Sequence, residues 1–322
     1  MRSLTWIAVF GAVCCSPAAT LPLEGELFHP ATNVEVIWDA TNSLPKQLWI
    51  YQVMPGAFSA GVVSNAMALG NFTMKDLTKA GIPPFQDKNL LHFENKNELG
   101  RRRWLYIAPG LGTMKFESER NTTASVENVP TADEAEAAAR DLLFQLGIDS
   151  SLLAERVRKG YDETTTPIDR SGNVLGPERT LSMGLSFERR VDGFPLSENW
   201  CFLAHFDSHR RLRDFTLRWR NIVPGEIHSV LSSEQIVQLV KSGQAILPPQ
   251  FTDTSGVKTA KVLKIKKLSV LYFDGTGKEP LDFLVPYASV EISAQDSGNN
   301  QVSVILYCSP ILAYSSLGRL NP

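Results

Sequence analysis

The chain has 322 residues, of which 43% are apolar and 20% are charged, and its formal net charge is −2. The length exceeds one typical domain, and the composition is that of a globular protein with a sizeable core. The near-neutral charge excludes a general attraction to polyanions, so no nucleic-acid partner is expected. No cofactor is expected either, because no phosphate-binding loop motif is present.

The chain begins with an export-signal pattern. Residues 4–15 form an uncharged, largely apolar run, Arg2 precedes it, and small residues follow at 16–20. The run is too short to cross a bilayer as a helix. The alternative, a buried N-terminal helix, has no capping residue or polar face in its favour. We therefore predict a signal peptide over residues 1–20 and a secreted or periplasmic protein without stable membrane insertion after its removal.

The next stretch, residues 21–128, is predicted to form an N-terminal α+β unit. Apolar alternation predicts strands, and an apolar stripe ending at Gly70 predicts a helix. The strands are expected at 34–38, 48–53, 90–94 and 103–118, the last of these turning at 109–112, and the helix is expected at 58–69.

Residues 129–322 are predicted to form one or more further units and a β-rich extension. Thr131 and Glu134 form a capping box before a helical stripe over 135–146, which Gly147 ends. Ser232 and Gln235 repeat that pattern before a helix that ends at Gly243. Strands are expected at 181–187, 200–206, 212–219, 258–273, 281–293 and 301–308, with a turn at 192–193, a hairpin loop at 296–300 and a long polar connection at 148–178.

These elements give the order helix, then antiparallel strands, about three times. The sequence therefore predicts an α+β fold in which antiparallel sheets are each covered by a helix, in loosely repeated units. The other face of such a sheet is either solvated or holds a partner.

The segment from Thr131 to about Ile246 resembles a PepSY-like domain. The likeness lies in the helix 135–146, the strand 181–190 with the turn 191–196, and the strands 200–206 and 212–219. The whole chain is similar to exported regulatory proteins of the YycH and YycI type, and segments such as 65–76 resemble those of uncharacterised exported bacterial proteins. This resemblance implies a mostly non-catalytic protein with inhibitory or sensing roles. It supplies no catalytic residue, and the membrane anchor common in the YycH and YycI type is missing from this sequence.

Two cysteines follow the signal, and two sequons are present. Cys201 and Cys308 both lie in strand-like runs, so a disulfide between them and two buried thiols both remain open. Asn71 and Asn121 each begin an Asn-x-Thr sequon, which makes them candidate glycosylation sites.

No catalytic constellation stands out. His205 and His209 flank a turn without a neighbouring Glu, so no metal site is expected. The adjacent triplet at 207–209 holds the residue types of a catalytic triad, but a triad draws its members from distant segments. Carboxylates that could serve a hydrolase lie near strands and turns, and nothing singles out a pair: Glu98, Glu117, Glu188, Asp192, Asp207 and Asp214.

Basic residues gather on two strand-like runs. Arg210, Arg211, Arg213 and Arg218 surround Phe215 and Trp219, and Arg beside aromatic rings can bind polyanions or carboxylates. Lys258, Lys261, Lys264, Lys266 and Lys267 crowd a second run. The alternative for both runs is a solvated outer face that protects strand edges.

The sequence thus favours an exported, non-catalytic binding or regulatory protein that acts through protein or peptide contacts. Two alternatives stay open: a secreted hydrolase with an unrecognised carboxylate site, and a polyanion binder that uses the Arg and Lys strands.

Overall fold

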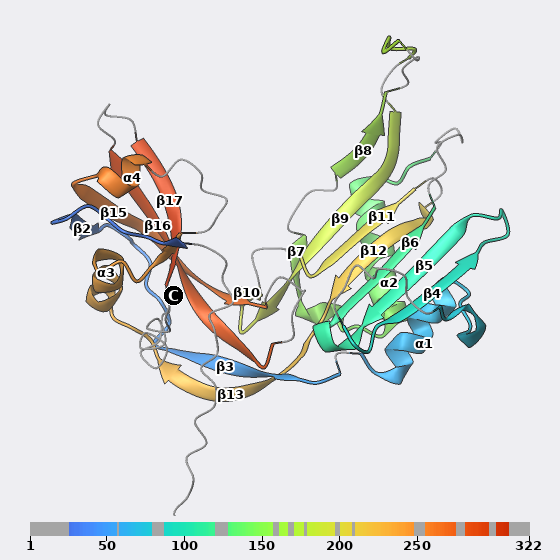
Figure 1. The fold of residues 1–322 in the computed structure, drawn as a ribbon, viewed down its shortest axis with the longest axis horizontal. Coiled ribbons are helices and arrows are strands. Elements are labelled where there is room, and N and C mark those ends of the chain that lie inside the picture. The colour runs from blue at the N-terminus through green and yellow to red at the C-terminus, as the bar shows by residue number, and fades with distance from the viewer. Residues whose placement is uncertain are drawn as a thin grey trace, which may run out of the picture.

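The fold is seen in a computed structural model, which describes residues 26–56, 58–78, 87–119, 128–156, 161–166, 171–176, 179–196, 200–207, 210–247, 255–274, 281–295 and 301–308. Strands dominate this part of the chain, and they form a large mixed sheet with only a few helices (Figure 1). The prediction of antiparallel sheets each covered by a helix, in loosely repeated units, is wrong. The alternation of apolar residues identified most of the strands. However, strands from different predicted units pair with one another.

The first lobe, at the right of Figure 1, runs from α1 to β12. Its strands lie antiparallel in the order β4, β5, β6, β12, β11, β9, and β7 and β8 also pair with β9. The bounds are α1 Ala60–Leu69, β4 Leu91–Lys96, β5 Arg102–Ala108, β6 Thr113–Ser118, α2 Ala132–Leu146, β7 Leu153–Arg156, β8 Tyr161–Thr165, β9 Arg179–Val191, β11 Phe202–Phe206 and β12 Leu212–Arg218. The pair β6–β12 joins strands from the two sides of residue 128.

The second lobe, at the left of Figure 1, combines the two ends of the described chain. Its strands lie in the order β1, β14, β17, β16, β15, β2, and the pair β15–β2 is parallel. The bounds are β1 Glu26–Leu27, β2 Glu35–Trp38, α3 Ser233–Lys241, β14 Ile246–Leu247, α4 Ser255–Thr259, β15 Val262–Phe273, β16 Phe283–Gln295 and β17 Gln301–Cys308.

A ribbon of two long strands connects the lobes, as Figure 1 shows along its lower side. It consists of β3, Gln47–Met54, and β13, Asn221–Ser229, which pair antiparallel. The first two residues of β16 pair with β3. Strand β10, Phe194–Leu196, pairs with β9 of the first lobe and with β15 of the second. Strand β13 was not predicted, because Pro224 and Gly225 interrupt its pattern and nearly all of it is exposed.

Helices α2 and α3 begin where their capping residues predict, whereas α4 was not predicted and occupies the first residues of the strand expected at 258–273. Thr131 accepts a hydrogen bond from the Glu134 backbone, and the Glu134 side chain accepts one from the Thr131 backbone, which confirms the capping box of α2. Gly147 follows in the left-handed region at φ 78°. Ser232 and Gln235 form the same box before α3. These are local interactions, and each box satisfies two backbone donors that the first helical turn leaves free.

Residues 148–178 differ from the long connection that their polar composition predicted. The described part of this range contains the short 3₁₀ helix η3 (Ser150–Leu152) and the strands β7 and β8, which pair with β9. Strand β9 is thirteen residues long, so its edge offers hydrogen bonds to a segment whose own sequence has little strand character.

Each lobe has its own hydrophobic core. In the first lobe the inward faces of the strands pack against α2 through Ala139, Leu142 and Leu143. In the second lobe α3 contributes Ile236 and Val240 to a cluster with β15, β16 and β17. A smaller cluster around Tyr272 lies where the ribbon meets both lobes. No helix in the described ranges is long and apolar enough to cross a membrane.

Candidate functional site

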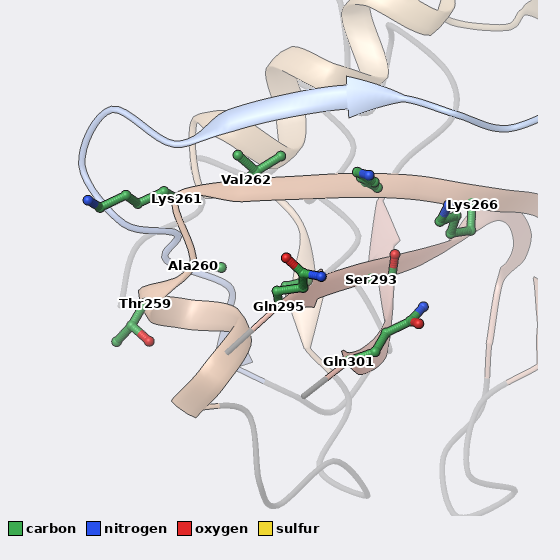
Figure 2. A pocket seen from close by; sticks show the side chains of 10 residues that line it. Thr259, Ala260, Lys261, Val262, Lys266, Ser293, Gln295 and Gln301 are labelled. Atoms are coloured by element: carbon green, nitrogen blue, oxygen red, sulfur yellow. The ribbon is translucent and has the colours of Figure 1, made fainter. Parts of the chain in front are cut away.

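The candidate site is a hollow of about 580 Å³ in the second lobe, and we call it the lysine hollow (Figure 2). It lies where β15 begins, β16 ends and β17 begins. Its described lining residues are Thr259, Ala260, Lys261, Val262, Lys264, Lys266, Ser293, Ala294, Gln295 and Gln301. This volume lies in the range of sites that hold small ligands or a few residues of a peptide.

Strand alternation explains why polar groups line the hollow. Leu263 and Ile265 of β15, with Ile292 of β16, belong to the core that α3 covers. Their sequence neighbours therefore project from the opposite face of the sheet. On that face Lys264 is paired in register with Ser293, and Gln295 is paired with Gln301.

Figure 2 shows how these groups lie. The hydroxyl of Ser293, the amides of Gln295 and Gln301, and the ammonium of Lys266 stand on the same side of the strands. Ammonium groups donate hydrogen bonds, whereas the amides and the hydroxyl both donate and accept. The hollow therefore offers donors and acceptors beside a positive charge, which suits a ligand that is polar and anionic.

The lysines of the hollow differ in their partners. Lys266 forms an ion pair with Asp39, and this hydrogen bond, followed by the lysine charge, holds the pKa of the Asp39 carboxyl below its ordinary value. Lys261 and Lys264 form no ion pair with any residue in the described part of the chain. A β-bulge between Ile265 and Lys267 exposes two successive lysines of β15. Among the described residues, Lys266 is thus the one lysine lining the hollow that a carboxylate neutralises in an ion pair.

A second group of charges is buried where the lobes meet. Arg189 donates to the Arg220 carbonyl at 2.6 Å, and its guanidinium lies 4.1 Å from the centre of the Trp219 ring. Asp274, at the end of β15, is buried nearby; burial raises the pKa of its carboxyl, although the neighbouring arginine charges oppose this. This cluster ties β9 of the first lobe to β15 of the second.

A third polar group crosses β9, β11 and β12. His205 Nδ1 lies 2.5 Å from Asp214 Oδ1, Arg213 Nε lies 2.7 Å from Asp214 Oδ2, and Arg213 also donates to Ser182 at 2.9 Å. Burial alone would raise the pKa of Asp214, but the hydrogen bond and charge of His205, with those of Arg213, lower it below 3.8. Its members bond to one another across three strands, which is the pattern of a structural network.

The four arginines predicted as a polyanion contact do not form one exposed surface. Arg213 is buried in the network just described, and Arg210 pairs with Glu134 of α2. The guanidinium of Arg218 lies 4.8 Å from the centre of the Trp200 ring, and only Arg211 is exposed without such a contact among the described residues. Alternation put Arg211 and Arg213 on one face, but that face also carries the buried Phe215, so it is not a solvated basic surface.

The structure contains two buried free thiols instead of the disulfide. Cys201 belongs to the core of the first lobe and Cys308 to the core of the second. Burial raises the pKa of both thiols to about 12. A thiol in this state is a poor nucleophile, so neither cysteine is a candidate catalytic residue.

The remaining predicted sites are partly outside the described residues. Asn71 is exposed at the end of α1 with φ 51°, whereas Asn121, His209 and the loop 296–300 lie outside the described ranges. Those ranges hold no group of three His, Cys, Asp or Glu that could bind a metal. The lysines of the hollow were visible in the sequence as a basic run, but the glutamines that face them on β16 and β17 gave no signal of their own.

No protein-family model and no curated protein matches the chain. Among solved structures, the chain is similar to the crystal structure of an uncharacterised protein from Eubacterium rectale, determined at 1.45 Å resolution. The two are 12% identical, the match covers 87% of this chain and 88% of the other, and the TM-score is 0.39. A likeness this low carries no argument about fold or function.

Proposed function

We propose that the protein is a non-catalytic binding protein that acts through contact with a protein or peptide partner. The observation that carries the proposal is the lysine hollow, which lies at one end of the sheet face opposite α3; farther along that face, Leu271, Tyr287 and Tyr307 belong to a buried cluster. One face of that sheet is covered by α3, and the other presents paired polar side chains around the hollow. A partly solvated antiparallel sheet can hold a partner on its open face.

Export belongs to the same proposal. The signal pattern over residues 1–20 supports secretion or a periplasmic location, and the resemblance to PepSY-like and YycH- and YycI-type proteins supports a regulatory role. The hydrolase alternative has less in its favour, because the described lining residues of the hollow include no carboxylate. The polyanion alternative is weakened by the burial of Arg213 and the pairing of Arg210.

A peptide library displayed against the purified protein tests this proposal. Selected peptides would be labelled, and their binding would be measured by fluorescence anisotropy on the native chain and on two variants. Gln301→Trp fills the hollow, and Gln47→Trp is its control, because both glutamines are exposed first residues of a strand. We expect binding to the native chain and to Gln47→Trp, with a loss of at least tenfold for Gln301→Trp.

Two results would contradict the proposal. Selected peptides that bind the Gln301→Trp variant as well as the native chain would place the contact elsewhere. Peptides recovered in cleaved form after incubation with the purified protein would reveal hydrolysis and remove the non-catalytic part of the proposal.

A further inference from the structure

We infer that the partner segment is acidic and that the lysine hollow binds one of its carboxylates beside Lys261 and Lys264. This inference rests on the proposed function and names the chemistry of the partner. Its basis is the charge of the site. Lys258 forms an ion pair with Glu26, and Lys266 forms one with Asp39. Lys261 and Lys264 form no ion pair among the residues that the structure describes, although the charge of Lys264 also acts on Asp39 at longer range.

The geometry explains why a carboxylate suits this place. Lys264 stands in register with Ser293 on β16, so an anion that contacts its ammonium also comes within reach of a hydroxyl donor. Ser293 is only 4% exposed, so the wall of the hollow around it is enclosed by protein atoms. Such a wall strengthens an ion pair beside it, because the effective dielectric constant is lower there than in water.

The neighbouring amides explain why the carboxylate would belong to a peptide. Gln295 and Gln301 face each other across β16 and β17 and both line the hollow. Each amide can donate to a peptide carbonyl and accept from a peptide N–H. A segment lying over these strands would therefore find backbone partners at the glutamines and a charge partner at the lysines.

The alternative anion is a phosphate group. A phosphate group carries nearly two negative charges and binds best where several cations, or the N-terminus of a helix, converge on it. The described lining residues of the hollow include no Arg, and their cations are lysines carried on one strand, β15, and at its start. The observations therefore favour carboxylates, and phosphorylated peptides become one outcome of the test.

The test uses three peptides of one length and backbone composition. They carry Glu, Gln or phosphoserine at the same positions, and each is made with a free and with an amidated C-terminus. Binding would be measured by fluorescence anisotropy at about 50 mM and about 500 mM salt, because the screening length falls several-fold over that range. The native chain would be compared with Lys264→Gln, Lys264→Glu, Lys264→Arg and the control Lys88→Glu, which changes an exposed lysine of the first lobe.

We expect the Glu peptide to bind at least tenfold more tightly than the Gln peptide, with an affinity that falls as salt rises. Lys264→Gln should lower the affinity for the Glu peptide by about fivefold, which is the largest effect expected from the loss of one partly exposed ion pair. Lys264→Glu should weaken it further, and Lys88→Glu should leave it within twofold. Lys264→Arg, which keeps the charge, should restore most of the affinity. If the amidated peptide binds as tightly as the free peptide, the bound carboxylate belongs to a side chain. If amidation removes binding, the bound carboxylate is the C-terminus of the peptide.

Several results would overturn the inference. Equal binding of the Gln and Glu peptides with no loss on amidation, preference for the phosphopeptide, or no effect of Lys264→Glu would each do so. If the Gln peptide binds and Gln301→Trp still removes that binding, the proposed function stands and only the acidic partner is wrong. If no peptide binds the native chain, both proposals fail together.

Discussion

The network around Asp214 gives the sharpest prediction about stability. Asp214 accepts hydrogen bonds from His205 and Arg213, and the side chains of the three residues are 25%, 13% and 10% exposed. A hydrogen bond to a charged group contributes about 1.5–3 kcal/mol, and an amide can replace part of it. Because water screens the pair to some extent, Asp214→Asn should lower the free energy of unfolding at pH 7 by about 2–3 kcal/mol.

The pH dependence follows from the same pKa shift. The pKa of Asp214 in the folded protein lies below the 3.8 of an unperturbed carboxyl. Its contribution is therefore complete above about pH 4 and is lost as the pH falls through the folded-state pKa. Urea unfolding of the native chain and of Asp214→Asn at pH 7, 4 and 3 should show the difference in free energy narrowing at the lowest pH.

The control for this prediction is Asp141→Asn on α2, where the carboxyl is exposed. An exposed substitution of this kind should change the free energy of unfolding by no more than about 0.5 kcal/mol. If Asp214→Asn lowers the free energy of unfolding by no more than Asp141→Asn does, the reasoning is refuted. A difference that is as large at pH 3 as at pH 7 would refute the assigned role of the charge.

Two further substitutions test the packing of the first lobe, and one labelling experiment tests the state of the thiols. Phe215→Ala removes a fully buried ring that lies 6.0 Å from one neighbouring aromatic ring and 6.1 Å from another, so urea titration should show a loss of about 3–5 kcal/mol. Gly112→Ala should lower the free energy of unfolding by at least about 1 kcal/mol more than Gly100→Ala does. Both glycines have positive φ, but of the two only Gly112 would place the new Cβ 2.8 Å from a backbone oxygen. Cys201 and Cys308 should resist a thiol reagent in the folded protein and both react in urea, and labelling of either in the native state would contradict their burial.

The sequence predicted those elements whose signals are local. Capping boxes at Thr131 and Ser232 located two helices, because the hydrogen bonds of a cap join residues three apart. The turn at Asp192 and Gly193 was also predicted, and both residues have positive φ, as a tight hairpin turn requires. Each of these features depends on a few adjacent residues.

The sequence predicted the hairpin pairing of β16 with β17, but it could not predict pairing between strands far apart in the chain. Nothing in residues 35–38 indicates that they pair in parallel with residues 262–265. The alternation that identified β15 says which side chains share a face, but it does not say which strand lies beside it. The expected repeat of helix-covered sheets failed at this step, since strands such as β6 and β12 pair across the units that their order suggested.

Only the lysines of the candidate site could be recognised in the sequence. The lysines of β15 stood out as a basic run, and a solvated face was the simpler interpretation of it. What makes the run a site is the register of β16 and β17, which brings Ser293, Gln295 and Gln301 beside it. Those residues belong to the commonest surface types, so their sequence gave no reason to select them.

Hydrogen–deuterium exchange on the purified protein, with and without a bound Glu-rich peptide, tests the central claim most directly. We predict that the peptide slows exchange of backbone amides at the end of β16, in residues 291–295, and at the start of β17, in residues 301–304, while the ribbon of β3 and β13 is unchanged. Slower exchange confined to the first lobe or to the ribbon, with none at the hollow, would contradict the claim that the second lobe carries the binding site.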